Sequence, residues 1–141
     1  MFAGRVNDLY RGLKRIAKEV GIAIIILIQR NDNWKKRPTP KPMEGDAYGG
    51  GGVKQNLDVW FSLYRPEVFE DHMKQRAAEM RNQDEKTKLL VEIEDQRGKA
   101  WFINHKRRRG APNKSKSVSF KAQTVTFKSN PEHEPTFGEF R

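Results

Sequence analysis

Four consecutive cations, Lys106 to Arg109, stand between an apolar segment and the turn-forming residues Gly110, Pro112 and Asn113. This order predicts that the cations lie at the tip of a β-hairpin. A guanidinium can hold a phosphate through two parallel hydrogen bonds, and one fixed at a strand end can reach a γ-phosphoryl group in a neighbouring subunit. A solvated basic patch for a nucleic-acid backbone is the alternative, and the residues alone leave both open.

A long loop, residues 30–52, carries the second group of candidates. It contains three prolines, five glycines and five basic side chains, among them Lys35, Lys36 and Arg37, and it is longer than a structural connection needs. Its glycine run allows main-chain N–H groups to approach a phosphate, so the loop suits a nucleic-acid strand, with a flexible hinge as the alternative. Trp34 and Tyr48 could stack on bases.

Other polar residues offer weaker signals. Gln29 ends an apolar run and could sense a phosphate or orient a water, or it could simply close a strand. Asp58 lies at the start of a second apolar run and could be a carboxylate in a site, but a structural hydrogen-bond partner is the expected role. The three histidines, His72, His105 and His133, have no ligand spacing, so we expect no metal site.

Composition limits the class of protein. The 141 residues are 35% hydrophobic, which allows one domain with one modest core. A net charge of +10 indicates a polyanionic partner, most often nucleic acid. The absence of cysteine suits a reducing compartment, and the apolar run at 21–28 is too short to cross a bilayer. We therefore expect a soluble, cytoplasmic protein with no membrane partner.

The elements that must position these residues follow from apolar spacing. Apolar side chains three and four apart predict a helix over 6–20, ended by Gly21. Residues 22–28 read as a strand buried on both faces of a mostly parallel sheet, with Gln29 at its carboxyl end, where ligands bind in such sheets. Residues 53–56 predict a helical turn, and 57–64 a second buried strand that Pro66 stops.

The second half is predicted to mix helix and strand. Residues 67–88 are charged helix formers and predict a solvent-facing helix or a mobile excursion. Segments 89–95 and 100–105 read as strands joined by a hairpin turn at 96–99. Residues 117–127 alternate as one closing strand, and 128–141 carry no structural signal. We expect Trp60, Phe61, Trp101 and Phe102 in the core.

Three sequence blocks resemble a known family. They are LKRIAKEVGIAIIILIQ, GGGGVKQNLDVWFSLYR and INHKRRRG followed by a strand. In this order they resemble the C-terminal half of the RecA-like motor domain of DnaB-type replicative helicases, over residues 6–127. The resemblance implies an α/β fold, a partial RecA-like sheet with flanking helices and a C-terminal antiparallel hairpin. It also implies that 1–127 form that half domain, that 67–98 are an excursion atypical of the family, and that 128–141 are a flexible tail.

The resemblance implies roles for individual residues. Gln29 matches the glutamine that couples the γ-phosphate to the DNA-binding loop. Tyr48, Gly49, Gly50 and Gly51 match the segment whose backbone contacts single-stranded DNA, although the charged residues and serine usual in the family are absent here. Lys106 and Arg108 match a lysine and an arginine finger that reach the ATP site of the next subunit in a hexameric ring.

The chain departs from the family pattern in one large respect. It has no GxxxxGK[ST] loop and no apolar strand ending in an acidic residue for Mg²⁺. It therefore cannot hold ATP and Mg²⁺ by itself, and it is expected to be a fragment, one piece of a split motor that needs a separate nucleotide-binding half, or a relic. The first hypothesis is part of an ATP-dependent DNA helicase. The second is a non-catalytic nucleic-acid-binding or helicase-modulating protein derived from that fold.

Overall fold

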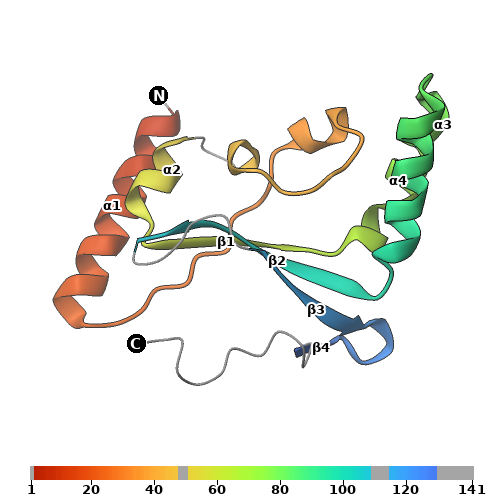
Figure 1. Ribbon diagram of the computed structural model, residues 1–141. Coiled ribbons are helices and arrows are strands. Elements are labelled where there is room, and N and C mark those ends of the chain that lie inside the picture. Colours follow the sequence, from red (N-terminus) through yellow and green to blue (C-terminus); the bar gives the residue numbers. More distant parts are fainter. Residues whose placement is uncertain (1, 48–50, 109–114, 130–141) are drawn as a thin grey trace.

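The first element is a long amphipathic helix, α1 (Phe2–Val20), as its apolar spacing predicts. The computed structural model describes residues 2–47, 51–108 and 115–129. Gly21 ends α1 at a φ of +71°, which glycine adopts without steric cost. The short helix α2 (Gly51–Asn56), predicted as a helical turn, packs beside α1, and Asn56 Nδ2 donates to Asn7 Oδ1 at 2.7 Å (Figure 1).

The described strands form one antiparallel sheet. Its strands are β1 (Val59–Tyr64), β2 (Lys99–Arg107), β3 (Ser115–Lys121) and β4 (Thr126–Ser129), hydrogen-bonded in that order. Val59 pairs with Arg107, and a bulge lies between Trp60 and Phe61. The bulge falls where β1 meets the basic end of β2, because Trp60 pairs with Lys106.

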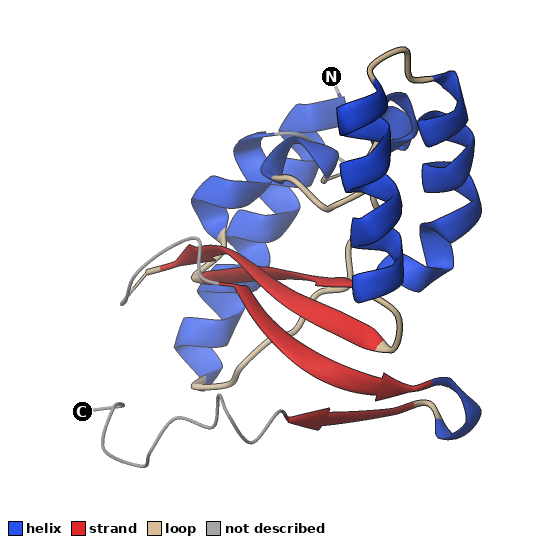
Figure 2. Ribbon diagram, turned by 45° about the vertical axis from the view of Figure 1, so that its right-hand side comes forward, coloured by secondary structure: helices blue, strands red, loops and turns tan. Residues whose placement is uncertain are grey.

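A helical hairpin separates β1 from β2. A 3-10 turn (Pro66–Phe69) leads into α3 (Glu70–Glu79), and α4 (Gln83–Asp95) returns beside it (Figure 2). Asn82 begins α4 by accepting hydrogen bonds from the N–H groups of Asp84 and Glu85 at 2.9 and 3.3 Å. The hairpin has its own core, formed by Met73, Ala77, Leu89 and Ile93.

Two predictions for this region were wrong. Residues 67–88 form two helices instead of one, and 89–95 are the end of α4 instead of a strand. Leu89 and Ile93 lie four residues apart, so a helix places both against Met73 and Ala77. The turn at 96–99 consequently joins a helix to a strand.

Polar contacts tie the base of the hairpin to the sheet. Glu67 Oε2 accepts a hydrogen bond from the Gly98 N–H at 3.2 Å, and Arg65 forms an ion pair with Glu67. The Arg65 guanidinium lies 3.6 Å from the centre of the Phe120 ring. The helical hairpin is therefore joined to the sheet at the point where α3 and α4 leave it.

The predicted strand at 22–28 is wrong within the described part of the chain. The segment is extended, but Ala23 to Gln29 make no backbone hydrogen bond to any described residue. It is also not buried on both faces, because Ile25 and Leu27 are 86% and 95% exposed. An apolar run becomes a strand only where a neighbouring strand satisfies its backbone groups.

The remaining differences concern the sheet. Residues 117–127 form β3, a 3-10 turn (Ala122–Thr124) and the start of β4 instead of one strand, because Val125 reverses the chain at a φ of +49°. Trp60 is buried as predicted, but Phe61 is 55% exposed, and β1 is not buried on both faces. Lys128 and Ser129 belong to β4, and the rest of the predicted tail lies outside the described residues. No helix in the described ranges has the length and apolarity to cross a membrane.

Candidate functional site

The basic residues lie along the end of β2. Lys106 and Arg107 are its last two residues, and Arg108 follows directly. β2 pairs with β3 in the predicted antiparallel arrangement. Lys106 and Arg107, however, belong to the strand itself and not to the turn of the hairpin. Arg109 to Asn113 lie outside the described residues.

Lys106 is directed at the end of α2. Its Nζ donates to the main-chain carbonyl oxygens of Lys54 and Gln55, the second at 3.4 Å. A cation at a helix C-terminus meets carbonyl groups that have no partner within the helix. Burial lowers the pKa of Lys106, and the nearby charges of Arg108 and Lys14 lower it further. Lys106 therefore couples the basic strand end to α2.

Arg108 is held by Asp58. The Arg108 N–H donates to the Asp58 main-chain oxygen at 3.0 Å, and Arg108 Nε lies 3.2 Å from Asp58 Oδ1. Lys14 Nζ of α1 reaches the same carboxylate oxygen at 2.8 Å. The hydrogen bond from Lys14 is the main cause of a lowered pKa at Asp58. Asp58 is thus a structural partner, as expected, and it orients Arg108.

The long loop is organised around Asp46, which sequence reasoning did not single out. Its buried carboxylate accepts hydrogen bonds from Arg37 at 2.8 and 2.6 Å, from Arg30 at 3.3 Å and from the Met43 N–H at 3.0 Å. Burial by itself raises the pKa of Asp46, but the hydrogen bonds and charges of the arginines outweigh it and lower the pKa. The loop holds three acids, Asp32, Glu44 and Asp46, among its five cations, and no spacing in the sequence distinguishes Asp46 from the other two.

This cluster changes the expected role of Arg37. Both of its terminal nitrogens are engaged, with Asp46 and with the Lys41 main-chain oxygen at 3.1 Å. Lys35 pairs with Asp32 at 2.8 Å, and Lys36 is exposed at the end of the 3-10 turn Asp32–Lys36. Lys35 and Lys36 therefore face solvent, whereas Arg37 holds the loop together.

Trp34 anchors the loop to the hairpin. Its ring lies 5.0 Å from that of Phe69 and 5.3 Å from that of His72, both edge to face. Arg76 Nη2 adds a hydrogen bond to the Lys35 main-chain oxygen at 2.7 Å. The indole is already packed on protein rings, which gives it a structural role in place of the predicted base stacking.

The glycine segment precedes α2. Tyr48, Gly49 and Gly50 lie outside the described residues, and Gly51 is the first residue of α2. The helix that Lys106 contacts at its C-terminus is therefore the one that follows this segment directly. Gly51, the described residue of the predicted DNA-contact segment, thus begins the helix whose C-terminal carbonyl groups accept from Lys106.

Gln29 is exposed at the end of the extended segment, just before Arg30 bridges to Ala47. It lines a groove of about 760 Å³ that Asp58 also lines. Gln29 and the carboxylate partner of Arg108 thus face one shared space.

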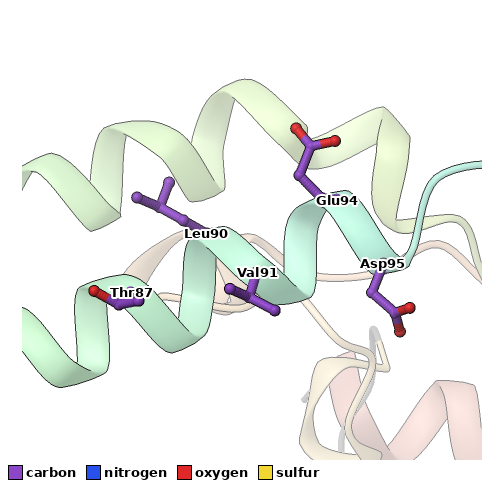
Figure 3. Close-up of a pocket in the computed structure, with 5 residues that line it drawn as sticks. All are labelled: Thr87, Leu90, Val91, Glu94 and Asp95. Carbon is purple, nitrogen blue, oxygen red and sulfur yellow. The ribbon is translucent and has the colours of Figure 1, made fainter.

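A second, shallow hollow lies on the outer face of α4 (Figure 3). Its lining residues all come from that one helix, and they are Thr87, Leu90, Val91, Glu94 and Asp95. A single helix face encloses no ligand, so it is not a candidate active site.

The described residues bring together no candidate set of metal ligands. Residues 2–47, 51–108 and 115–129 hold no group of three or more His, Cys, Asp or Glu side chains arranged to bind a metal ion. The acid nearest the basic strand end, Asp58, is already neutralised by Lys14 and Arg108.

Comparison with known proteins identifies the family. Residues 3–129 match the model of the DnaB-like helicase C-terminal domain. The replicative DNA helicase DnaB of Helicobacter pylori is 30% identical over 104 residues, which are 74% of this chain and 20% of that protein. DnaB of Buchnera aphidicola is 33% identical over 67 residues, 48% of this chain and 14% of that protein. The chain thus spans about a fifth or less of these relatives.

Solved structures confirm the fold. The ATPase domain of G40P superposes with a TM-score of 0.68 at 21% identity, covering 92% of this chain and 38% of that one. A DnaB-like replicative helicase studied with primase also gives 0.68 at 21% identity, covering 92% and 26%. The predicted RecA-like α/β fold is therefore confirmed, and the chain belongs to the DnaB-like helicase C-terminal domain family.

Proposed function

We propose that this chain is part of a replicative ATP-dependent DNA helicase. In this proposal Arg108 is the trans-acting arginine finger, Lys106 supports it, Gln29 is the phosphate sensor, and the segment from Tyr48 to Gly51, with Lys35 and Lys36, contacts single-stranded DNA. ATP and Mg²⁺ are held mainly by residues that this sequence does not contain. The partner is either the next subunit of a hexameric ring or a separate nucleotide-binding half.

The position of Arg108 is the observation that carries the proposal. Its pair with Asp58 is exposed on both sides, with side chains 54% and 57% accessible. Exposed pairs of this kind contribute only about 0 to 1 kcal/mol. Asp58 can therefore orient the guanidinium without preventing it from turning toward a phosphate, where charge-assisted hydrogen bonds are stronger.

The contact between Lys106 and α2 supports a link between DNA and nucleotide. Bound single-stranded DNA that displaces the residues before Gly51 would also displace α2, which begins at Gly51. Lys106 contacts the carbonyl groups at the C-terminal end of α2. Displacement of α2 would thus be transmitted to the strand end that carries Arg108.

The test is single-strand-stimulated ATP hydrolysis by a mixture of this chain and a polypeptide that carries a GxxxxGK[ST] loop. Arg108→Ala should lower the rate by about 10³-fold or more, as loss of an arginine finger does. Arg107→Ala is the matched control, because Arg107 is the neighbouring exposed cation and the last residue of β2.

A different result supports the other hypothesis. If both variants leave hydrolysis unchanged and weaken salt-sensitive DNA binding equally, the cations form a phosphate-binding patch. The chain would then be a non-catalytic nucleic-acid-binding or helicase-modulating protein.

A further inference from the structure

The 3-10 turn Asp32–Lys36, called here the basic turn, lies against the helical hairpin. It carries Lys35 and Lys36, and Figure 1 shows it in orange between α2 and the hairpin. None of its five residues is buried, so apolar burial alone does not fix its orientation. The side chains that reach it from other elements must do so.

Two side chains of α3 bind main-chain oxygens at the C-terminal end of the basic turn. Arg76 Nη2 donates to the Lys35 oxygen at 2.7 Å, and His72 Nε2 donates to the Arg37 oxygen at 3.0 Å. The Trp34 oxygen accepts from the Arg37 N–H at 3.1 Å. The last carbonyl groups of a helical turn have no partner within it. Donors from α3 therefore hold the end of the basic turn in place.

Ring contacts hold the basic turn at a second point. The Trp34 ring lies 5.0 Å from that of Phe69 and 5.3 Å from that of His72, both edge to face. The Arg30 guanidinium lies 5.4 Å from the centre of the Trp34 ring and 5.8 Å from that of Phe69. His72 thus contacts this region twice, through its ring and through Nε2.

The hairpin itself lacks the charge of a phosphate-binding surface. Residues 70–95 hold eight acidic side chains against five lysines and arginines, in a chain of net charge +10. Two of those five cations are paired within α3, Lys74 with Glu70 at 2.6 Å and Arg76 with Glu79 at 2.9 Å. An influence of the hairpin on nucleic-acid binding is therefore exerted through the basic turn and not through its own cations.

We propose that α3 positions the basic turn for nucleic acid: His72 and Arg76 hold it so that Lys35 and Lys36 meet the phosphates of a single strand. This inference rests on the proposed DNA contact of the two lysines and names the element that orients them. Without the α3 contacts the lysines keep their charge but lose their fixed direction. Binding then includes the cost of ordering the turn, which lowers the affinity.

Single-strand affinity tests the proposal. The full chain is titrated into a fluorescein-labelled oligothymidylate, and the dissociation constant is measured by anisotropy over a series of salt concentrations. Arg76→Ala should weaken binding about threefold to tenfold, which corresponds to one lost hydrogen bond, and His72→Ala should act similarly. Arg76→Lys keeps a donor and should restore most of the affinity. Arg81→Ala, at an exposed cation between α3 and α4, is the matched control and should leave the affinity unchanged.

A double-mutant cycle separates positioning from direct contact. Replacing both Lys35 and Lys36 with Ala should weaken binding and reduce its salt dependence, because fewer phosphates are neutralised. In that background Arg76→Ala should have no further effect, since it acts through the lysines. An additive loss, or an equal loss from Arg81→Ala, would show that the hairpin cations meet the phosphates themselves and would overturn the proposal.

Amide hydrogen exchange reports on the basic turn without DNA. Arg76→Ala should accelerate exchange of the Arg37 N–H, which donates to the Trp34 oxygen, and leave exchange at Leu89 and Ile93 in the hairpin core unchanged. Unchanged exchange at Arg37, or faster exchange throughout the hairpin, would overturn the positioning role.

The same measurements distinguish failure of this inference from failure of the proposed function. If replacing Lys35 and Lys36 weakens binding but the His72 and Arg76 variants do not, the DNA contact stands and the positioning role is overturned. If replacing the lysines has no effect, their proposed DNA contact is wrong, and this inference is overturned with it. The role of Arg108 is measured separately, by ATP hydrolysis.

Discussion

The core of the helical hairpin and the segment at 22–28 both consist of apolar residues, yet they differ sharply in burial. In the hairpin, Met73 and Ile93 are 2% and 3% exposed, whereas Leu27 in the segment is 95% exposed. The core residues of the hairpin pack against one another because a short turn places α3 and α4 side by side. Within the described residues, no strand pairs with the segment and nothing covers Leu27. The contrast shows that apolar composition alone does not place a residue in a core.

The largest expected effect on stability tests this contrast directly. Met73→Ala should lower the free energy of unfolding by about 2 to 5 kcal/mol, because it leaves a cavity in a closed core. Leu27→Ala should change it by no more than about 0.5 kcal/mol, because the side chain is already in solvent. Urea unfolding followed by circular dichroism measures both. Similar losses at the two positions would contradict the distinction.

The loop after the segment is closed by charge instead of apolar contact. Asp46→Asn should destabilise the protein by about 2 to 3 kcal/mol, somewhat below the usual loss for a buried ion pair, because Arg30 and Arg37 are 24% and 27% exposed. Asp32→Asn, at an exposed pair in the same loop, is the control and should change stability by less than about 1 kcal/mol.

The pKa of Asp46 adds a pH dependence to that prediction. Its pKa is lower in the folded state than in the unfolded chain, where it is about 4. The stabilisation is therefore complete above the unfolded pKa and is lost as the pH falls through the folded value. The free energy of unfolding should therefore fall less between pH 7 and pH 3 in Asp46→Asn than in the wild type, as unfolding curves at the two pH values will show. An unchanged pH dependence would contradict the assigned role.

The smallest effect is expected at the basic strand end. Lys106→Met should cost at most about 1 kcal/mol, since the hydrogen bonds to α2 are offset by the burial that lowers the pKa of Lys106. The more sensitive measurement is hydrogen exchange, which should become faster in α2. Arg107→Met should leave that exchange unchanged, and acceleration by both variants would argue against a specific contact.

Local sequence signals predicted several elements because those elements depend on near neighbours. The apolar stripe and Gly21 were sufficient for α1, and the residues from Val59 to Tyr64 and around Trp101 predicted β1 and β2. Residues 89–95 were misread because short apolar runs suit either a helix or a strand. Residues 89–95 adopt the helix because it packs Leu89 and Ile93 against Met73 and Ala77.

The candidate site residues divide in the same way. Residue type and position after apolar segments marked Lys106, Arg108 and Gln29 as candidates. The sequence did not predict that Lys106 contacts α2 or that Arg108 pairs with Asp58. Asp46 was overlooked because its partners Arg30 and Arg37 lie 16 and 9 residues away in a loop without regular spacing. Backbone folding of that loop brings the three together.

By itself the sequence determined the basic charge, the amphipathic α1, the order of the three sequence blocks that resemble the family, and the cations at the end of β2. These depend on residue types and on spacings within a few turns or strands. Only the tertiary structure decided that Asp46 organises the loop, that Lys106 contacts α2, and that the most apolar segment lies open beside β1. Such features arise from contacts between residues distant in the chain, and an apolar run carries no record of the neighbour that covers it.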